Sequence, residues 1–143
     1  MHVSEIMKRK VGNVITVRPS TNLARAIELL VSNKIGAAPV CEPGGAIIGL
    51  LTERDILHGI AGHGTNILEM QVKEVMSNKV YYCTPEDDLK HIMSVMTTNH
   101  VRHLLVMVED QLSDIVSVGD VVRSRMEESQ LEVEVLRDYA RSH

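Results

Sequence analysis

The stretches "LLTERDI" (residues 50–56) and "IVSVGDV" (residues 115–121) carry one pattern twice. Each has two aliphatic residues, a hydroxyl residue, two variable residues, an aspartate and a final aliphatic residue. The hydroxyl and carboxylate residues are Thr52 with Asp55 and Ser117 with Asp120. Self-similarity at a fixed spacing is typical of repeated structural units. The chain is therefore predicted to contain one unit twice.

The repeat extends well beyond these two stretches. "VSEIM" at residues 3–7 recurs as "VKEVM" at 72–76, and residues 14–40 align without a gap with residues 80–106. Few of the aligned residues are identical, but the apolar positions coincide, as an internal repeat requires. The predicted boundaries are a first repeat at 1–62, a connecting seam at 63–71, a second repeat at 72–125 and a C-terminal helix at 126–143.

Each repeat has the pattern of a short strand, a helix, two strands joined by a turn, and a second helix, which predicts an α+β fold. The first strand is expected to end before Pro19 or Pro85, because proline suits the end of a strand and not its interior. Thr84 is the predicted N-cap of the helix that follows in the second copy. The last helix of each repeat is expected to begin near Asp55 or Asp120.

Composition excludes several function classes. With 44% hydrophobic residues among 143, the chain can bury a substantial core. A net charge of -4 disfavours binding to nucleic acid or anionic membranes by bulk electrostatics. No apolar run fits a signal peptide or a membrane span, so a cytoplasmic, soluble protein is expected. Cys41 and Cys83 have no metal-site spacing and are expected to be buried thiols.

The repeated hydroxyl and aspartate allow two interpretations. In one, each pair is a capping box that starts a helix and needs no ligand. In the other, the hydroxyl and the N–H groups of the helix N-terminus receive a phosphate, while the carboxylate accepts hydrogen bonds from ribose hydroxyls. The capping box is the better explanation of either pair taken singly, and recurrence of the pair after aliphatic strands in both repeats adds weight to the second interpretation.

The motifs "IGAAPV", "IIGLLTERDIL", "VRHLLV" and "DIVSVGDVV" resemble those of tandem CBS (cystathionine-beta-synthase) domain proteins, in particular the short stand-alone bacterial type. The resemblance covers the chain from Val3 to about Arg125. It implies two β-α-β-β-α repeats that form a pseudo-two-fold pair, with a C-terminal helical extension. It also implies that the repeats bind an adenine nucleotide in the cleft between them.

The resemblance also implies which residues contact that nucleotide. Asp55 and Asp120 would accept hydrogen bonds from ribose, and Thr52 and Ser117 would meet phosphate. The other residues implied are Arg54 beside the phosphate, Thr16 and Tyr82 at the base, and the backbone around Gly36, Ala37, Ala38, Arg102, His103 and Leu104. The small side chains of Ala37 and Ala38 are equally compatible with close strand packing.

Three positions of the second repeat interrupt the pattern. Arg102 and His103 are adjacent, so they point to opposite faces of a strand and at most one is expected to face a given cleft. His100 and His103 are three residues apart on an extended segment, a spacing that does not suit a metal, and no metal site is predicted. Asp114 stands where the first repeat has Gly49, so a backbone with positive φ would be strained there.

The segment after Asp120 carries a different signal. Val122, Met126, Ser129, Val133, Leu136 and Ala140 recur in steps of four and three. Such a stripe packs either on the chain's own domain or on a partner helix. Because CBS modules commonly pair, a homodimer is expected.

No phosphate loop, nucleophile motif or metal set indicates an enzyme. The sequence therefore predicts a regulatory sensor of AMP, ADP, ATP or NAD, without catalysis or a required cofactor, acting on an unidentified regulated protein. The alternative is a ligand-free structural or partner-binding dimer that uses the C-terminal helix.

Overall fold

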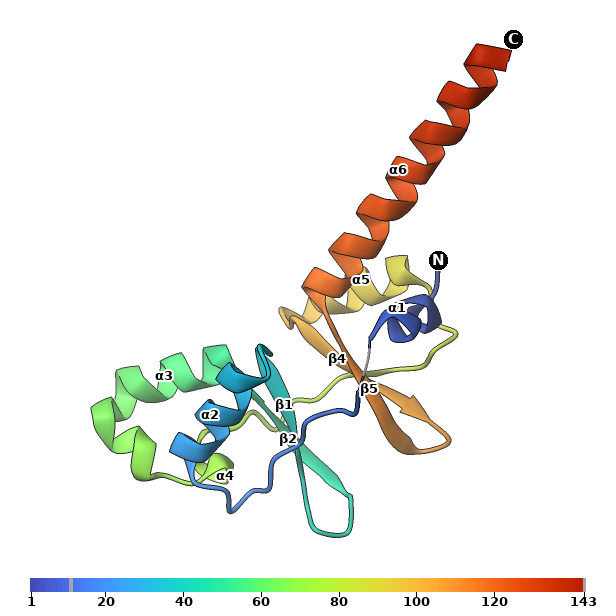
Figure 1. Cartoon of the computed structure of the whole chain (residues 1–143). Helices are drawn as coiled ribbons and strands as arrows, with labels where there is room; N and C mark the ends of the chain where they lie inside the picture. Colours follow the sequence, from blue (N-terminus) through green and yellow to red (C-terminus); the bar gives the residue numbers. More distant parts are fainter. Residues whose placement is uncertain (11, 143) are drawn as a thin grey trace. The chain divides into compact units, whose positions relative to one another are not determined.

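The computed structural model describes residues 1–10 and 12–142, and the chain divides into two compact units (Figure 1). The first-repeat unit is Asn13–Val80, and the second-repeat unit joins Met1–Gly12 to Tyr81–His143. The two sequence repeats thus exchange their opening helices. Helix α1 (Val3–Arg9) belongs to the second-repeat unit, and α4 (Val72–Val75) belongs to the first-repeat unit.

The first-repeat unit is built around an antiparallel strand pair. Strands β1 (Ala37–Cys41) and β2 (Ile47–Thr52) are flanked by helices α2 (Leu23–Ser32) and α3 (Glu53–His63), and the 3-10 helix η1 (Gly64–Glu69) leads to α4. The strand predicted before Pro19 is reduced to one parallel bridge between Val17 and Val40.

The second-repeat unit holds a three-stranded sheet in the order β3-β4-β5. Strand β3 (Tyr82–Cys83) pairs in parallel with β4 (His103–Val108), which pairs antiparallel with β5 (Gln111–Ser117). Helix α5 (Leu89–Asn99) links β3 to β4, and α6 (Val118–Ser142) follows β5 directly. The predicted α+β class, the two repeats and the C-terminal helix are confirmed.

Each unit has its own apolar core, as the repeated hydrophobic pattern requires. The first-repeat core gathers Leu23, Ala26, Leu30, Val40, Leu51, Ile67 and Val72 with their neighbours. The second-repeat core gathers Val3, Ile6, Leu89, Ile92, Leu104, Val106, Val116 and Val121 with theirs. Both cores are aliphatic, and each contains the opening helix of the other sequence repeat, so neither repeat builds its core from its own residues alone.

The two units share local irregularities at equivalent positions. The strand register shifts after Val40 in one unit and after Val106 in the other. Lys34 and His100, which follow α2 and α5, both have positive φ, 55° and 54°. Non-glycine residues seldom take this left-handed conformation, so its recurrence shows that the repeat is preserved in backbone detail.

The helix start predicted at Thr84 is wrong. Helix α5 begins at Leu89, and its N-cap is Asp88, whose side chain accepts a hydrogen bond from the N–H of Lys90 at 2.7 Å. Thr84 instead opens a turn, and its own N–H donates to the Asp87 carboxylate at 2.8 Å. The hydrogen bond within this turn is made by an N–H that would otherwise lie at the start of a helix. The helix therefore begins four residues after Pro85, where the sequence predicted it.

Gly49 does not have a positive φ, so the proposed strain at Asp114 does not arise. Glycine is needed at position 49 because of close approach. A Cβ there would lie 2.7 Å from Sδ of Met76 and 2.8 Å from the carbonyl oxygen of Ser77. Ser77 pairs with Leu50 through two backbone hydrogen bonds of 2.9 Å, which bring its main chain against β2.

Burial of the two thiols differs. Cys83 is buried, as predicted, while Cys41 is half-buried. Burial, reinforced by Asp87 and Asp114, raises the pKa of Cys83 to about 12, so this thiol stays protonated at neutral pH.

Helix α6 has two different parts. Its first turns pack on the second-repeat core through Val121 and Ser124, and Glu127 forms an ion pair with Arg9 of α1. From residue 129 onward all described residues of the helix are exposed. None of the helices within residues 1–10 and 12–142 is long and apolar enough to cross a membrane.

Candidate functional site

In the first repeat, the hydroxyl and the carboxylate meet at the junction of β2 and α3. Thr52 ends the strand and caps the helix, and its Oγ1 accepts a hydrogen bond from the N–H of Asp55 at 3.2 Å. Asp55 Oδ2 accepts from both the N–H and the hydroxyl of Thr52, each at 2.9 Å. These reciprocal bonds are a capping box. They fix a half-buried carboxylate at the helix start.

The second repeat builds the same arrangement where β5 meets α6. Asp120 Oδ2 accepts from the N–H of Ser117 at 2.9 Å, and Ser117 Oγ accepts from the N–H of Asp120 at 3.1 Å. Both interpretations of the motif begin from this geometry. The capping box explains each pair singly, and the chemistry of a hydroxyl, a carboxylate and helix N–H groups also suits a phosphorylated ribose.

Lys10, which sequence reasoning missed, joins the second pair. Its Nζ lies 2.8 Å from Oδ2 of Asp120 and 3.8 Å from Oδ1 of Asp114, and it donates a hydrogen bond to the carbonyl oxygen of Ile115. The two carboxylate side chains are 14% and 15% exposed, and Lys10 is 31% exposed. The signal available in the sequence was its place three residues after "VSEIM", where the other copy has Lys79.

The cluster shifts two pKa values. Burial disfavours the charged form of Asp120, but the hydrogen bonds from Lys10 and Ser117 and the charge of Lys10 outweigh it and hold its pKa below the usual value. Burial lowers the pKa of His103, and Lys10 and Arg102 lower it further against the opposing effect of Asp120. His103 is therefore neutral at pH 7 while Asp120 is ionised.

The other predicted residues of the first repeat fall into two groups. Thr16 and Arg54 are exposed, whereas Ala37 and Ala38 are buried in the strand core, which fits close packing of small side chains. Gly36 lies beside the site. Its carbonyl oxygen accepts from the N–H of Glu53 at 3.0 Å, and Ala37 is paired in register with Thr52.

The second repeat arranges the equivalent residues in the same way. The carbonyl oxygen of Arg102 accepts from the N–H of Val118 at 2.8 Å, and His103 is paired with Ser117. Arg102 is exposed, His103 is half-buried and Leu104 is buried in the core. Tyr82 on β3 is 51% exposed. Within this unit the strands bring Arg102 and His103 to Ser117 and Asp120.

The charges at the two helix starts differ. In the first repeat, the carboxylate of Glu53 lies 3.3–3.5 Å from where a Cβ on Gly36 would be. In the second repeat, the equivalent positions hold Val118 and Arg102, so a valine replaces the glutamate and an arginine replaces the glycine. The same backbone frame thus carries an acid in one copy and a base in the other.

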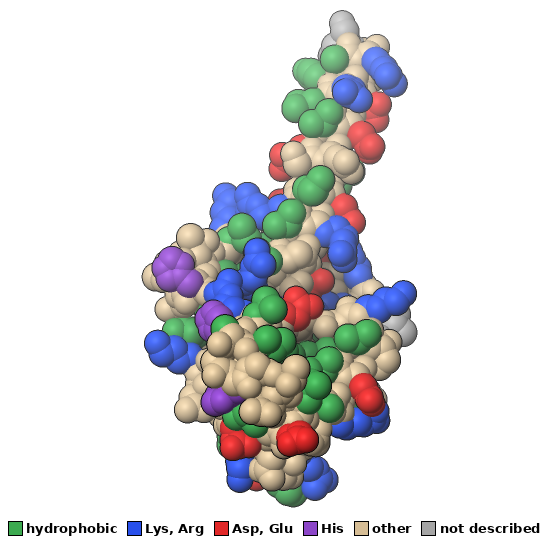
Figure 2. Space-filling view, turned by 90° about the vertical axis from the view of Figure 1, so that its left-hand side faces the viewer, with side chains coloured by type: hydrophobic (Ala, Val, Ile, Leu, Met, Phe, Trp, Pro, Cys, Tyr) green, Lys and Arg blue, Asp and Glu red, His purple; other side chains and the backbone are tan. Residues whose placement is uncertain are grey.

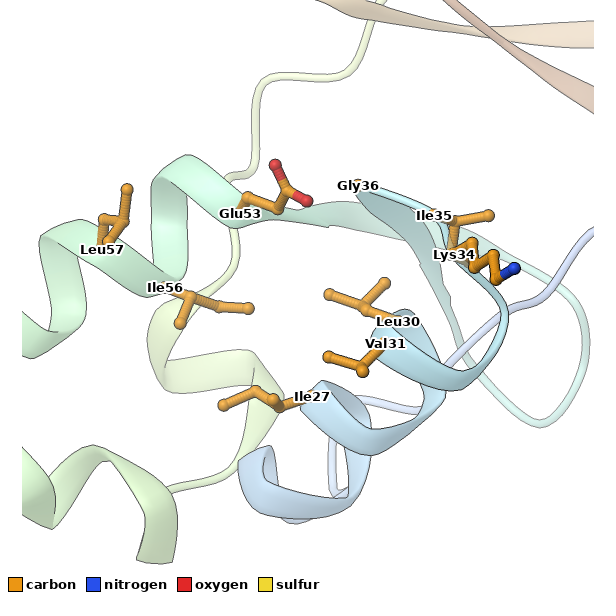
Figure 3. Close-up of a pocket in the computed structure, with 9 residues that line it drawn as sticks. All are labelled: Ile27, Leu30, Val31, Lys34, Ile35, Gly36, Glu53, Ile56 and Leu57. Carbon is orange, nitrogen blue, oxygen red and sulfur yellow. The ribbon is translucent and has the colours of Figure 1, made fainter.

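An apolar groove of about 630 Å³, which the sequence analysis did not predict, runs between α2 and α3 (Figure 3). Ile27, Leu30 and Val31 from α2 face Ile56 and Leu57 from α3. Lys34 and Glu53 are its only charged lining residues among those described. Val31 and Leu57 are 72% and 65% exposed. This lining suits an apolar side chain better than a phosphate.

Comparisons with known proteins agree with this architecture. A family model for the CBS domain matches residues 3–62 and 72–127. The chain belongs to the CBS-domain family. CBS-domain pairs are regulatory modules, and the two matched segments are the two sequence repeats.

Individual relatives have the same organisation. The mitochondrial CBS domain-containing protein CBSX3 of Arabidopsis thaliana is 31% identical over 145 residues, covering 96% of this chain and 70% of that protein. The crystal structure of the CBS-domain containing protein ATU1752 from Agrobacterium tumefaciens is 34% identical, with a TM-score of 0.83, covering 87% of this chain and 92% of that one. The match therefore spans most of both chains.

A more distant structure was solved with ligands. The CBS domain pair of protein MJ0100, in complex with 5′-methylthioadenosine and S-adenosyl-L-methionine, is 19% identical with a TM-score of 0.78. The match covers 90% of this chain and 98% of that one. At this identity the likeness shows the fold alone.

Proposed function

We propose that this CBS-domain chain is a regulatory sensor that binds an adenine nucleotide, one of AMP, ADP, ATP or NAD, and catalyses no reaction. The observation that supports it is the hydroxyl–carboxylate pair built twice. Thr52 with Asp55 and Ser117 with Asp120 stand at equivalent strand-to-helix junctions. Each pair can serve simply as a helix cap. Binding of a ribose phosphate would use the hydroxyl and the carboxylate of the pair together with the N–H donors of the helix N-terminus.

The nucleotide would be held by the residues that surround these pairs. Asp55 and Asp120 would accept hydrogen bonds from ribose, and Thr52 and Ser117 would meet phosphate, with Arg54 beside the first. Tyr82 and Thr16 would contact the base, next to the strand backbones at Gly36 and Arg102. Binding of the nucleotide would stabilise one arrangement of the protein and thereby signal to a regulated partner.

The test is titration calorimetry with AMP on the unmutated chain and on Asp55→Ala and Asp120→Ala, with thermal unfolding measured in parallel. Each variant should lose nucleotide-induced stabilisation at one site, and its affinity should fall about 10- to 100-fold, the value of one or two hydrogen bonds to a charged group. Asp138→Ala, in the exposed part of α6, is the matched control. Unchanged titrations in both site variants would refute the assignment.

One observation favours a second function, a structural or partner-binding homodimer. Helix α6 exposes Val133, Leu136 and Tyr139 at 44%, 67% and 63%. Figure 2 shows hydrophobic side chains gathered along one side of this helix and charged ones mostly on the other. A helix with such a stripe is stabilised by packing on another helix. The occupant proposed is α6 of a second copy, in parallel register, which would place Glu132 beside Arg137 of the second copy.

Sedimentation of the full chain tests this dimer. Val133→Glu with Leu136→Glu should convert a dimer into a monomer, because two acids would be buried in the seam. Val135→Glu, which adds an acid to α6 outside this stripe, is the matched control and should remain dimeric. A dimer that survives the double substitution would contradict pairing through α6. Native mass spectrometry of the purified protein separates the two functions, since a retained nucleotide favours the sensor.

A further inference from the structure

Lys10 holds the carboxylate to which the proposed function assigns the ribose, and the inference below rests on that function. Its ammonium is 2.8 Å from Asp120 Oδ2, the oxygen that also accepts from Ser117. It also donates to the carbonyl of Ile115, so the side chain is fixed from two directions. A ribose hydroxyl that takes Oδ2 of Asp120 must therefore displace this ammonium.

The released ammonium needs a new anionic partner. Asp114 is its second carboxylate, but it lies 3.8 Å from Nζ, beyond normal hydrogen-bond distance. Lys10 is two-thirds shielded from water, so leaving its charge with only that contact costs free energy. A phosphate group on the ligand offers charge-assisted hydrogen bonds in exchange. An uncharged adenosine derivative offers none.

The net charge around Lys10 also favours a ligand that carries phosphate. Lys10, Arg102 and Arg123 are cationic, Asp114 and Asp120 are anionic, and neutral His103 adds nothing, so the formal balance of the group is positive. Removing the charge of Lys10 makes the balance zero. We propose that Lys10 is a specificity-determining residue that makes the second-repeat site select adenosine ligands carrying phosphate over uncharged adenosine derivatives.

The first repeat provides an internal control for this assignment. Lys79 occupies the position equivalent to Lys10, three residues after "VKEVM". Its side chain is exposed, and within the described parts of the chain it forms no ion pair. Among the described residues, the same residue type at the same position of the repeat therefore forms no ion pair with Asp55, and only Lys10 is expected to affect ligand choice.

Calorimetry with AMP and with 5′-methylthioadenosine, an uncharged adenosine derivative, tests the assignment. Asp55→Asn confines strong binding to the second repeat and serves as the background. In this background AMP should bind at least about 10-fold more tightly than 5′-methylthioadenosine, a difference of one charge-assisted contact. Adding Lys10→Met should weaken AMP and strengthen 5′-methylthioadenosine, so that the ratio falls to about 3-fold or less.

The controls separate the possible results. Lys79→Met should leave the ratio unchanged, and Lys10→Gln serves if Lys10→Met does not fold, as judged by circular dichroism. If Lys10→Met leaves the ratio of the two affinities unchanged, or if Lys79→Met lowers it equally, the role of Lys10 is refuted while the proposed function still stands. If the unmutated chain binds neither ligand, the proposed function fails, and the inference fails with it.

Discussion

The two units share one order of strands and helices, but they protect the edge of the last strand differently. In the first-repeat unit the main chain of Ser77 pairs with Leu50, and Gly49 leaves room for it. In the second-repeat unit Asp114 replaces that glycine, and the side chain of Lys10 reaches the carbonyl of Ile115. The second-repeat unit thus has a lysine side chain where the first has the main chain of Ser77, and this lysine brings its positive charge to Asp120. One substitution in a repeat can thus change the chemistry of the neighbouring site.

The largest effect is expected when the residue of the second repeat is placed in the first. Gly49→Asp would put a Cβ 2.8 Å from the Ser77 carbonyl, a backbone atom that cannot move aside without breaking its pairing with Leu50. Unfolding in urea should show a loss of about 3 kcal/mol in stability.

The reciprocal substitution is the control for that experiment. Asp114→Gly removes a side chain that lies 3.8 Å from Lys10 and accepts one hydrogen bond, from the N–H of Ile115 at 2.7 Å, so it should cost only about 1 kcal/mol. Equal losses for the two variants would show that the edges of β2 and β5 are packed alike, contrary to the structure.

A smaller difference is expected between the two carboxylates. Asp120→Asn removes the negative charge that lies 2.8 Å from the ammonium of Lys10 and should cost about 1.5 kcal/mol, since the pair is partly shielded from water. Asp55→Asn only weakens a capping box and should cost about 0.5 kcal/mol. Thermal unfolding of both variants without nucleotide measures the difference. If Asp55→Asn is the more costly, Lys10 does not stabilise the second site.

The smallest effect concerns pH. The pKa of His103 is lowered by burial, so the unfolded chain binds the proton more readily than the folded one. Stability should therefore be complete above the ordinary pKa near 6.5 and fall as the pH decreases below it. His103→Gln should remove this part of the slope in melting temperature between about pH 5 and 8, the range where histidine titrates. His91→Gln, on the exposed side of α5, should leave the slope unchanged.

Residue types and spacing predicted most of the local structure. The alternation and spacing of apolar residues predicted the strands and helices that follow Pro19 and Pro85, but not the opening helices α1 and α4. The paired motifs placed Thr52 and Ser117 at helix starts. The start of α5 was predicted four residues early, because proline after Thr84 is compatible with either a helix or a turn. Local preferences alone do not choose between these two.

The sequence by itself determined that the chain is a doubled α+β unit with a hydroxyl and a carboxylate at matching strand ends, because side-chain periodicity and capping depend on residues close in sequence. Only the tertiary structure decided that α1 and α4 are exchanged between the units, that Gly49 is required by the approach of Ser77, and that Lys10 reaches Asp120. Each of these joins residues far apart in the chain, and such contacts are set by how the elements pack.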